Sequence, residues 1–309
     1  MLMTRLEFRQ RFVQALSPLY DGREVQALFR RYVEKRLGVE YYLFLLDMDV
    51  PVDLPNDWET ELDRLASGDP FQYVMGRTEF CELSFKVTPA VLIPRPETEE
   101  LVTTIVAENR ERAGLSVLDI GTGSGAIAIT LAKKLQGATV VALDVSEDAL
   151  KVAGENAAYN SVSINFLRFD ILDNAPLPGR YDIIVSNPPY VPERDRVLMH
   201  QNVLDHEPAL ALFVPDDHPL LFYEAIASKA AVALNPGGRL YFETHEEFHS
   251  ELKQLLENYG FVNVECRLDM FGKPRFVIGQ RNGKDTIPPS INFFKNSFMC
   301  TARTNHLVR

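Results

Sequence analysis

Residues 116–126 have the sequence Ser-Val-Leu-Asp-Ile-Gly-Thr-Gly-Ser-Gly-Ala. A short apolar strand pattern ends at Asp119, and three alternate glycines then lead into an apolar helix pattern over 126–135. Glycine permits a tight turn and lets a ligand approach the backbone closely. The segment therefore predicts a strand, a ligand-binding turn and a helix, with a plain turn that packs helix on strand as the alternative.

Strand and helix patterns alternate on the carboxyl side of this turn. Strands are predicted at 139–143, 164–169, 181–185 and 239–243, with helices between them. This alternation predicts an α/β fold built on a doubly wound, mostly parallel sheet with right-handed crossovers. The last two strand patterns, at 261–267 and 274–279, suit an antiparallel edge of that sheet.

The chain ahead of the turn has a different pattern. Apolar residues recur at helical spacing up to residue 76, and Pro18, Gly38 and Gly68 end three helix patterns, which predicts a small helical bundle. These stripes suit a core, and a partner-binding groove on the outer face stays open. The predicted domains are the bundle over 1–76, a linker with a β-hairpin over 77–100, the α/β domain over 101–281 and an extension over 282–309.

Two carboxylates follow neighbouring strands of the predicted sheet. Asp144 ends the second strand about 20 residues after the glycine turn, where an acid that binds ribose hydroxyls is expected. Asp170 ends the third strand and is placed to accept a hydrogen bond from an adenine amino group, with Ile171 packing against the ring. A surface acid before a helix and a simple strand-ending turn are the respective alternatives. Together with the glycine turn, these strand ends outline an adenosine-shaped crevice.

The fourth strand is followed by Ser186-Asn187-Pro188-Pro189-Tyr190. Two prolines cannot continue a sheet ladder or a helix, and the residue before each is pushed to an extended conformation. The Asn187 side-chain oxygen and the Pro188 carbonyl are therefore two acceptors on a stiff loop, beside the Tyr190 ring. Such a pair suits the planar NH2 group of an amide or a nucleobase, whereas a tight turn is the alternative.

Composition narrows the class of protein. The 309 residues are 46% hydrophobic and 24% charged, which is typical of a globular chain with room for two domains. With a net charge of −11, the chain lacks the overall positive charge that is typical of proteins that bind duplex DNA. A local basic patch is not excluded. The three cysteines have no zinc-ligand spacing and suit a reducing compartment. The start is too polar for a signal peptide and no apolar run reaches membrane-spanning length, so a cytoplasmic location is expected.

With these motifs in order, the chain resembles the class I S-adenosylmethionine-dependent methyltransferases of amino groups. More narrowly, it resembles the release-factor glutamine methyltransferases, the PrmC or HemK family. The narrower resemblance rests on six segments: 68–76 (Gly-Asp-Pro-Phe-Gln-Tyr-Val-Met-Gly), 92–99 (Leu-Ile-Pro-Arg-Pro-Glu-Thr-Glu), 118–126, 144–150, 186–191 and 207–210 (Glu-Pro-Ala-Leu).

The resemblance implies a seven-stranded class I methyltransferase sheet, of Rossmann-like form, with a small N-terminal helical bundle. It implies S-adenosylmethionine as cofactor and, as substrate, the glutamine of the Gly-Gly-Gln loop in class 1 peptide chain release factors. The product would be N(5)-methylglutamine. The helical bundle would contact the release factor, and neither a membrane nor direct nucleic acid binding is expected.

The resemblance also implies roles for individual residues. Asn187 and Pro188 would hold the substrate amide, Tyr190 would stack on it or form a wall beside it, and Pro189 would complete the loop. From their own position between prolines at the predicted domain junction, Arg95 and Glu97 are expected to line the mouth of the substrate site, with a plain linker as the alternative. No metal is implied. The cofactor site would consist of Asp119, Gly121, Thr122, Gly123, Ser124, Gly125, Asp144, Asp170, Ile171 and Asn187.

Two departures and three rival functions accompany this interpretation. At Glu243-Thr244-His245 the family has Glu, an apolar residue and Gly, and the chain after Gln280 is not part of the family pattern.

The first rival function is that of a DNA or RNA base amino-methyltransferase, which needs base flipping or single-stranded access. The others are a cofactor-binding adaptor without activity and a dinucleotide oxidoreductase, since Gly121-x-Gly123-x-x-Ala126 meets the relaxed dinucleotide fingerprint.

Overall fold

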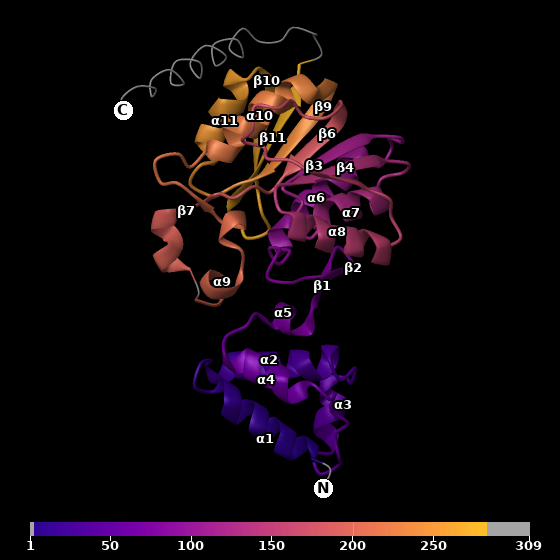
Figure 1. Cartoon of the computed structure of the whole chain (residues 1–309), viewed down its shortest axis with the longest axis vertical. Helices are drawn as coiled ribbons and strands as arrows, with labels where there is room; N and C mark the ends of the chain where they lie inside the picture. Colours follow the sequence, from indigo (N-terminus) through magenta and orange to yellow (C-terminus); the bar gives the residue numbers. More distant parts are fainter. Residues whose placement is uncertain (1–2, 200, 283–309) are drawn as a thin grey trace, which may run out of the picture. The chain divides into compact units, whose positions relative to one another are not determined.

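The computed structural model of the chain describes residues 3–199 and 201–282 (Figure 1). These residues divide into two compact units. The first holds 3–78, 87–89 and 199–207 without residue 200, and the second holds 79–86, 90–198 and 208–282. The extension predicted over 282–309 lies outside the described residues from 283 onward, and the predicted domain ranges stay predictions.

Short helices make up the first unit. They are α1 (Arg5–Leu16), α2 (Gly22–Lys35), α3 (Tyr41–Leu46), α4 (Trp58–Ala66), α5 (Phe71–Met75) and α9 (Gln201–His206). The sequence pattern predicts α1, α2 and α4. It does not reveal α3 and α5, because helices of six and five residues are too short to show a helical period.

Capping boxes begin the first two helices of this unit. Thr4 accepts from the Glu7 backbone amide and Glu7 caps Thr4 in return, and Asp21 and Glu24 do the same at α2. The core between the helices is aromatic, and the ring centroids of Phe12 and Phe29 are 5.2 Å apart.

No helix in the described part of the chain is long and apolar enough to cross a membrane.

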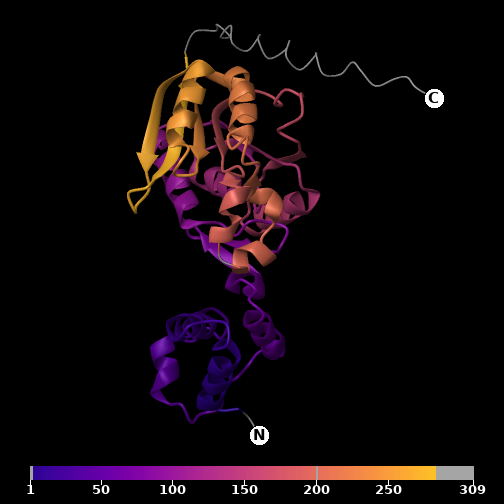
Figure 2. The same ribbon diagram turned by 90° about the vertical axis from the view of Figure 1, so that its left-hand side faces the viewer.

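The second unit contains the predicted α/β sheet. Within the described residues, seven strands form one sheet in the order β10-β11-β9-β6-β3-β4-β5 (Figures 1 and 2). Their bounds are β3 Ser116–Ile120, β4 Thr139–Asp144, β5 Asn165–Arg168, β6 Tyr181–Ser186, β9 Leu234–Glu243, β10 Phe261–Leu268 and β11 Pro274–Arg281. Strand β11 is antiparallel to both β9 and β10, and the other neighbours are parallel. The doubly wound sheet and its antiparallel edge are confirmed.

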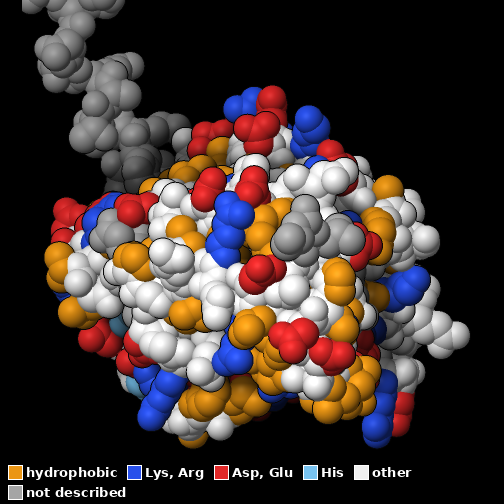
Figure 3. Space-filling model, turned by 90° about the horizontal axis from the view of Figure 1, so that it is seen from below, with side chains coloured by type: hydrophobic (Ala, Val, Ile, Leu, Met, Phe, Trp, Pro, Cys, Tyr) orange, Lys and Arg blue, Asp and Glu red, His pale blue; other side chains and the backbone are white. Residues whose placement is uncertain are grey.

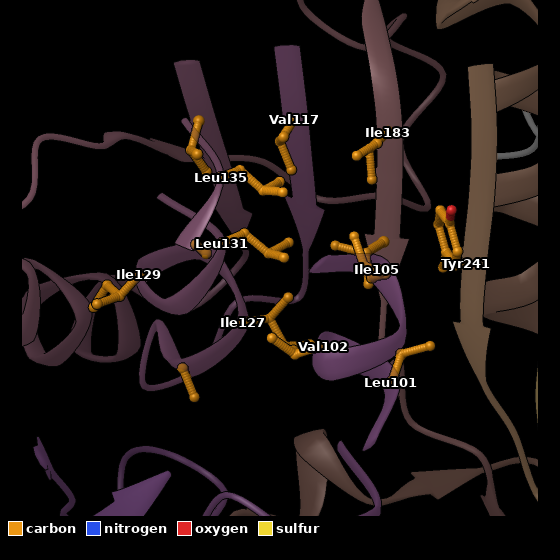
Figure 4. Close-up of a cluster of buried hydrophobic side chains, with 14 of the residues drawn as sticks. Leu101, Val102, Ile105, Val117, Ile127, Ile129, Leu131, Leu135, Ile183 and Tyr241 are labelled. Carbon is orange, nitrogen blue, oxygen red and sulfur yellow. The ribbon is translucent and has the colours of Figure 1, made fainter. Parts of the chain in front are cut away.

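Two hydrophobic cores cover the two faces of this sheet. Alternate residues of one strand point to opposite faces, so Val117 lies in one core with helices α6 (Pro96–Asn109) and α7 (Ala126–Lys134), as Figure 4 shows. Leu118 lies in the other core, with α10 (Leu221–Ala233) and α11 (His249–Asn258). Helix α8 (Glu147–Tyr159) adds Ala157 to the first core.

Smaller elements complete the second unit. They are β2 (Leu83–Lys86) with the last two residues of its partner β1 (Arg77–Phe80), the short pair β7 (Val191–Pro192) and β8 (Phe213–Val214), and 3-10 helices at Glu193–Leu198 and Ala209–Ala211. The chain runs from β3 outward through β4 to β5, then returns to place β6 on the other side of β3. Ligands of open α/β sheets bind at the carboxyl ends of the strands beside such a reversal.

Candidate active site

A cavity opens at the carboxyl ends of the central strands, all of it within the second unit. Its walls are supplied by the stretch before α6 and the first turn of that helix, the glycine turn after β3, the ends of β4 and β5, the loop after β6, the 3-10 helix Ala209–Ala211 and α10. The lining residues include Val91, Thr98, Gly121, Thr122, Gly123, Ser124, Asp144, Phe169, Asp170, Ile171, Asn187, Pro188, Pro189, Leu210 and Phe222.

The glycine turn presents bare backbone to this cavity. Gly121 and Gly123 have φ of +74° and +54°, a region that side chains disfavour, and a Cβ built on either would meet no atom within 4 Å. Asp144 fixes the turn from the next strand, because its Oδ2 accepts the Gly123 amide at 2.8 Å. Its Oδ1 accepts the Ser146 amide at 2.9 Å. Burial raises the pKa of Asp144, and these amide donors oppose the rise.

Asp119 lies behind the turn, at the end of β3, and is not among the residues that line the cavity. Its Oδ2 accepts the Thr122 hydroxyl at 2.6 Å and the Ala128 amide at 3.2 Å. Its Oδ1 is buried and has no hydrogen-bond partner among the described residues. Burial raises the pKa of Asp119 to about 7.

The far wall of the cavity is apolar. Phe169 and Ile171 flank Asp170 there, and both side chains pack against the second core. The Asp170 Oδ1 accepts the Leu172 amide at 2.9 Å, so this carboxylate closes its own turn.

The loop after β6 holds the two predicted acceptors at the opposite wall. The Asn187 side-chain amide donates from Nδ2 to the Thr98 hydroxyl at 3.2 Å. Among residues 3–199 and 201–282, no group donates to Asn187 Oδ1 or to the Pro188 carbonyl oxygen. Both oxygens are therefore available to a ligand's N–H groups.

A buried carboxylate lies behind this loop. Glu243, at the end of β9, accepts the Thr98 hydroxyl at 2.6 Å on Oε2 and the Tyr190 phenol at 3.1 Å on Oε1. Its backbone carbonyl accepts the Tyr223 phenol at 2.9 Å. Burial raises the pKa of Glu243, whereas the hydrogen bonds from Thr98 and Tyr190 and the charge of Arg275 lower it.

Comparisons with known proteins identify the family of this chain. The Methyltransferase small domain family matches residues 97–209. The Release factor glutamine methyltransferase of Flavobacterium psychrophilum is 43% identical over 275 residues, which cover 87% of this chain and 96% of that protein. The protein of the same name from Bacteroides thetaiotaomicron is 43% identical over 271 residues, 87% of this chain and 97% of that protein. The chain belongs to the release factor glutamine methyltransferase family.

The solved structures give weaker likenesses. The structure described as T. Thermophilus 16S rRNA N2 G1207 methyltransferase (RsmC) in complex with AdoMet and Guanosine is 19% identical, with a TM-score of 0.48. The likeness covers 67% of this chain and 50% of that one. The family assignment depends on the two relatives above.

The structure brings most residues predicted for a release factor glutamine methyltransferase to one cavity. Five residues do not line the cavity: Asp119, which lies behind the turn, Gly125, which is the N-cap of α7, Tyr190, which reaches Glu243 instead, and Arg95 and Glu97. The roles predicted for all of these site residues stay predictions.

Two polar residues of the site, Thr98 and Glu243, are not predicted from the sequence. Thr98 lies in the same Pro-Arg-Pro-Glu-Thr-Glu segment as Arg95 and Glu97, but its side chain is the one that faces Asn187. Glu243 stands in the sequence only as the start of the departing Glu-Thr-His segment. The position of Thr98 could have been predicted from helical spacing. Thr98 lies in the first turn of α6, three and four residues before Leu101 and Val102, so all three share one helix face, and that face is buried.

Proposed function

We propose that this protein transfers a methyl group from S-adenosylmethionine to the side-chain amide nitrogen of the glutamine in the Gly-Gly-Gln loop of class 1 peptide chain release factors. The observation that carries the proposal is the pair of unengaged acceptors, Asn187 Oδ1 and the Pro188 carbonyl, on the wall of a cavity that the open glycine turn also lines. An amide NH2 has two N–H groups and matches that pair.

The residues at the glycine turn fit the cofactor. Open space in front of Gly121 and Gly123 admits a ligand against the backbone, and the Asp144 carboxylate lies beside it for the ribose hydroxyls. Phe169 and Ile171 suit the faces of an adenine ring. When bound, the cofactor supplies a methyl group on a sulfonium, which is strongly electrophilic.

The chain's own contribution is to orient the amide and to stabilise the charge that develops on it. An amide nitrogen is a poor nucleophile, because its lone pair is delocalised into the carbonyl group. Asn187 Oδ1 and the Pro188 carbonyl accept the two amide N–H groups, which aims the nitrogen and stabilises positive charge as it develops there. Transfer of the cofactor's methyl group to this nitrogen would leave one amide proton to pass to solvent. N(5)-methylglutamine and S-adenosylhomocysteine are the products.

The helical unit is proposed to recognise the release factor. Its short helix α3 exposes apolar side chains, with Tyr42 61% and Leu46 76% exposed. Figure 3 shows a face on which apolar side chains gather between charged ones. Such groups on a surface mark interaction sites more often than isolated apolar residues do. A cytoplasmic location, where release factors act, stays a prediction.

The function is tested with labelled S-adenosylmethionine and two purified release factors, wild type and a variant with alanine for the glutamine of the Gly-Gly-Gln loop. Label is expected in the wild type alone. Asn187→Ala in the enzyme should lower turnover by about 100-fold with cofactor affinity nearly unchanged, since one acceptor that orients the reacting nitrogen is lost. Label in neither release factor, with cofactor bound, would refute the substrate assignment.

A further inference from the structure

We propose that Thr98 and Glu243 are positioning residues that fix the orientation of the Asn187 side-chain amide, so that its oxygen and not its NH2 group faces the substrate. This inference rests on the proposed function, since the orientation matters for an acceptor with N–H groups. It assigns a purpose to the Thr98 position of the Pro-Arg-Pro-Glu-Thr-Glu segment and to Glu243, neither of which has a role in the mechanism above.

The side-chain amide of asparagine has two nearly isosteric orientations. A flip about the last bond exchanges oxygen and nitrogen, and only hydrogen bonds distinguish the two. For Asn187 the wrong orientation would point two donors at a substrate that itself brings two N–H groups. Since donor would then face donor, binding in the reactive geometry would be lost.

Thr98 breaks this symmetry through the direction of its hydroxyl hydrogen bond. A hydroxyl has one proton to donate and lone pairs with which to accept. The Thr98 proton goes to Glu243 Oε2 at 2.6 Å, so the hydroxyl can only accept from Asn187, whose Nδ2 lies at 3.2 Å. If the amide flipped, Asn187 Oδ1 would face a lone pair of Thr98, and the contact would become repulsive.

Glu243 fixes the direction of the Thr98 hydroxyl because its Oε2 is an acceptor. The carboxylate is buried, with 1% of its surface exposed, and its other oxygen accepts the Tyr190 phenol at 3.1 Å. Water therefore does not compete for Oε2, and a short hydrogen bond from the Thr98 hydroxyl is favoured. The order Glu243, Thr98, Asn187 is a chain of two hydrogen bonds that ends at the substrate.

Strand pairing explains how three distant segments meet in this chain of hydrogen bonds. Thr98 is 145 residues from Glu243 and 89 from Asn187, and the three lie at the start of α6, the end of β9 and the end of β6. Strands β6 and β9 are neighbours in the sheet, and their pairing places Ser186 opposite Phe242. The residues that follow, Asn187 and Glu243, therefore emerge side by side, and Thr98 lies between their side chains.

The test compares substitutions at Thr98. Thr98→Val keeps the shape of the side chain and removes the hydroxyl, and should lower kcat by about tenfold or more with KM and cofactor affinity little changed. Thr98→Ser retains the hydroxyl and should rescue turnover. The matched control is Thr130→Val, because Thr130 is a fully buried threonine of the next helix whose hydroxyl has no partner among the described residues. It should leave kcat unchanged.

Two further readouts separate positioning from a structural effect. In a double-mutant cycle, Thr98→Val should cause little additional loss in single-turnover rate once Asn187 is alanine, whereas independent effects would add. The side-chain amide of Asn187, labelled with nitrogen-15 and assigned by its absence from Asn187→Ala, should exchange with solvent faster in Thr98→Val than in the wild type or Thr98→Ser.

The amide measurement needs no release factor, so it decides the positioning proposal even if the proposed substrate is wrong. Unchanged amide exchange in Thr98→Val, or a turnover within twofold of wild type, would overturn the positioning role. Failure of the wild type to label any release factor, with the amide result as expected, would overturn only the substrate.

Discussion

At the scale of single residues, the site depends on buried or half-buried polar groups with few partners. Asp119 is fully buried, and one of its oxygens has no partner among the described residues. Asn187 is held by one hydrogen bond through its nitrogen. Burial of this kind costs stability, and proteins retain it where the exposed or unpaired atom has a task.

Asp119 predicts a pH dependence of stability. Its folded-state pKa of about 7 lies above the ordinary value of 3.8, so the folded protein binds more protons than the unfolded chain between these values. The free energy of unfolding should therefore fall as pH rises through this window, by at most roughly 4 kcal/mol from this group. Asp119→Asn stays neutral and should lose this part of the dependence.

Urea unfolding of both proteins between pH 4.5 and 8 checks the prediction. The stability of Asp119→Asn relative to wild type should increase with pH. Parallel stability curves for the two proteins would show that Asp119 does not titrate in this range.

At the scale of elements, the glycine turn is fixed by a helix that lies some thirty residues further along the chain. Asn156 of α8 is fully buried, and its amide donates to the Ser124 carbonyl and to the Lys86 carbonyl, each at 2.9 Å. Its oxygen accepts the Lys86 amide at 2.6 Å. One side chain therefore joins β2, α8 and the end of the glycine turn.

Asn156→Ala should destabilise the protein by roughly 3 kcal/mol, since three backbone groups lose their partner. It should also weaken cofactor binding, because Ser124 belongs to the turn. Asn160→Ala is the control: Asn160 donates to the Ser84 and Asn156 carbonyls but not to the turn. Thermal unfolding and cofactor titration calorimetry measure both effects. Equal cofactor affinities in the two variants would contradict the role given to Asn156.

At the scale of the whole molecule, charge separates the proposed substrate from the main rival. The chain carries a net charge of −11, and nucleic acid binding depends largely on neutralising phosphates with Lys and Arg. We expect no saturable binding to duplex or single-stranded oligonucleotides at 50 to 150 mM salt. Fluorescence anisotropy provides the measurement. Saturable binding would contradict this expectation. If the logarithm of the affinity also fell linearly with the logarithm of the salt concentration, the result would favour a nucleic acid base as the methyl acceptor.

Local sequence patterns predict much of this fold. The order of strands and helices after residue 115, the antiparallel edge and the three longer helices of the first unit all follow from periodicity and from Gly and Pro positions. The short helices α3 and α5 do not, since their formation depends on packing in the unit. The loop 186–190 is predicted for the same local reason as the strands, because proline restricts the backbone wherever it occurs.

The sequence by itself therefore determined the class of sheet, the glycine turn, the stiff Asn-Pro-Pro-Tyr loop and, through its resemblance, the family. Only the tertiary structure decided which side chains stand behind Asn187. Thr98 and Glu243 are brought to it by the neighbouring positions of β6 and β9 in the sheet and by the packing of α6. Backbone preferences act over a few residues and can be read locally, whereas a contact across 145 residues exists only once strand order has placed its partners together.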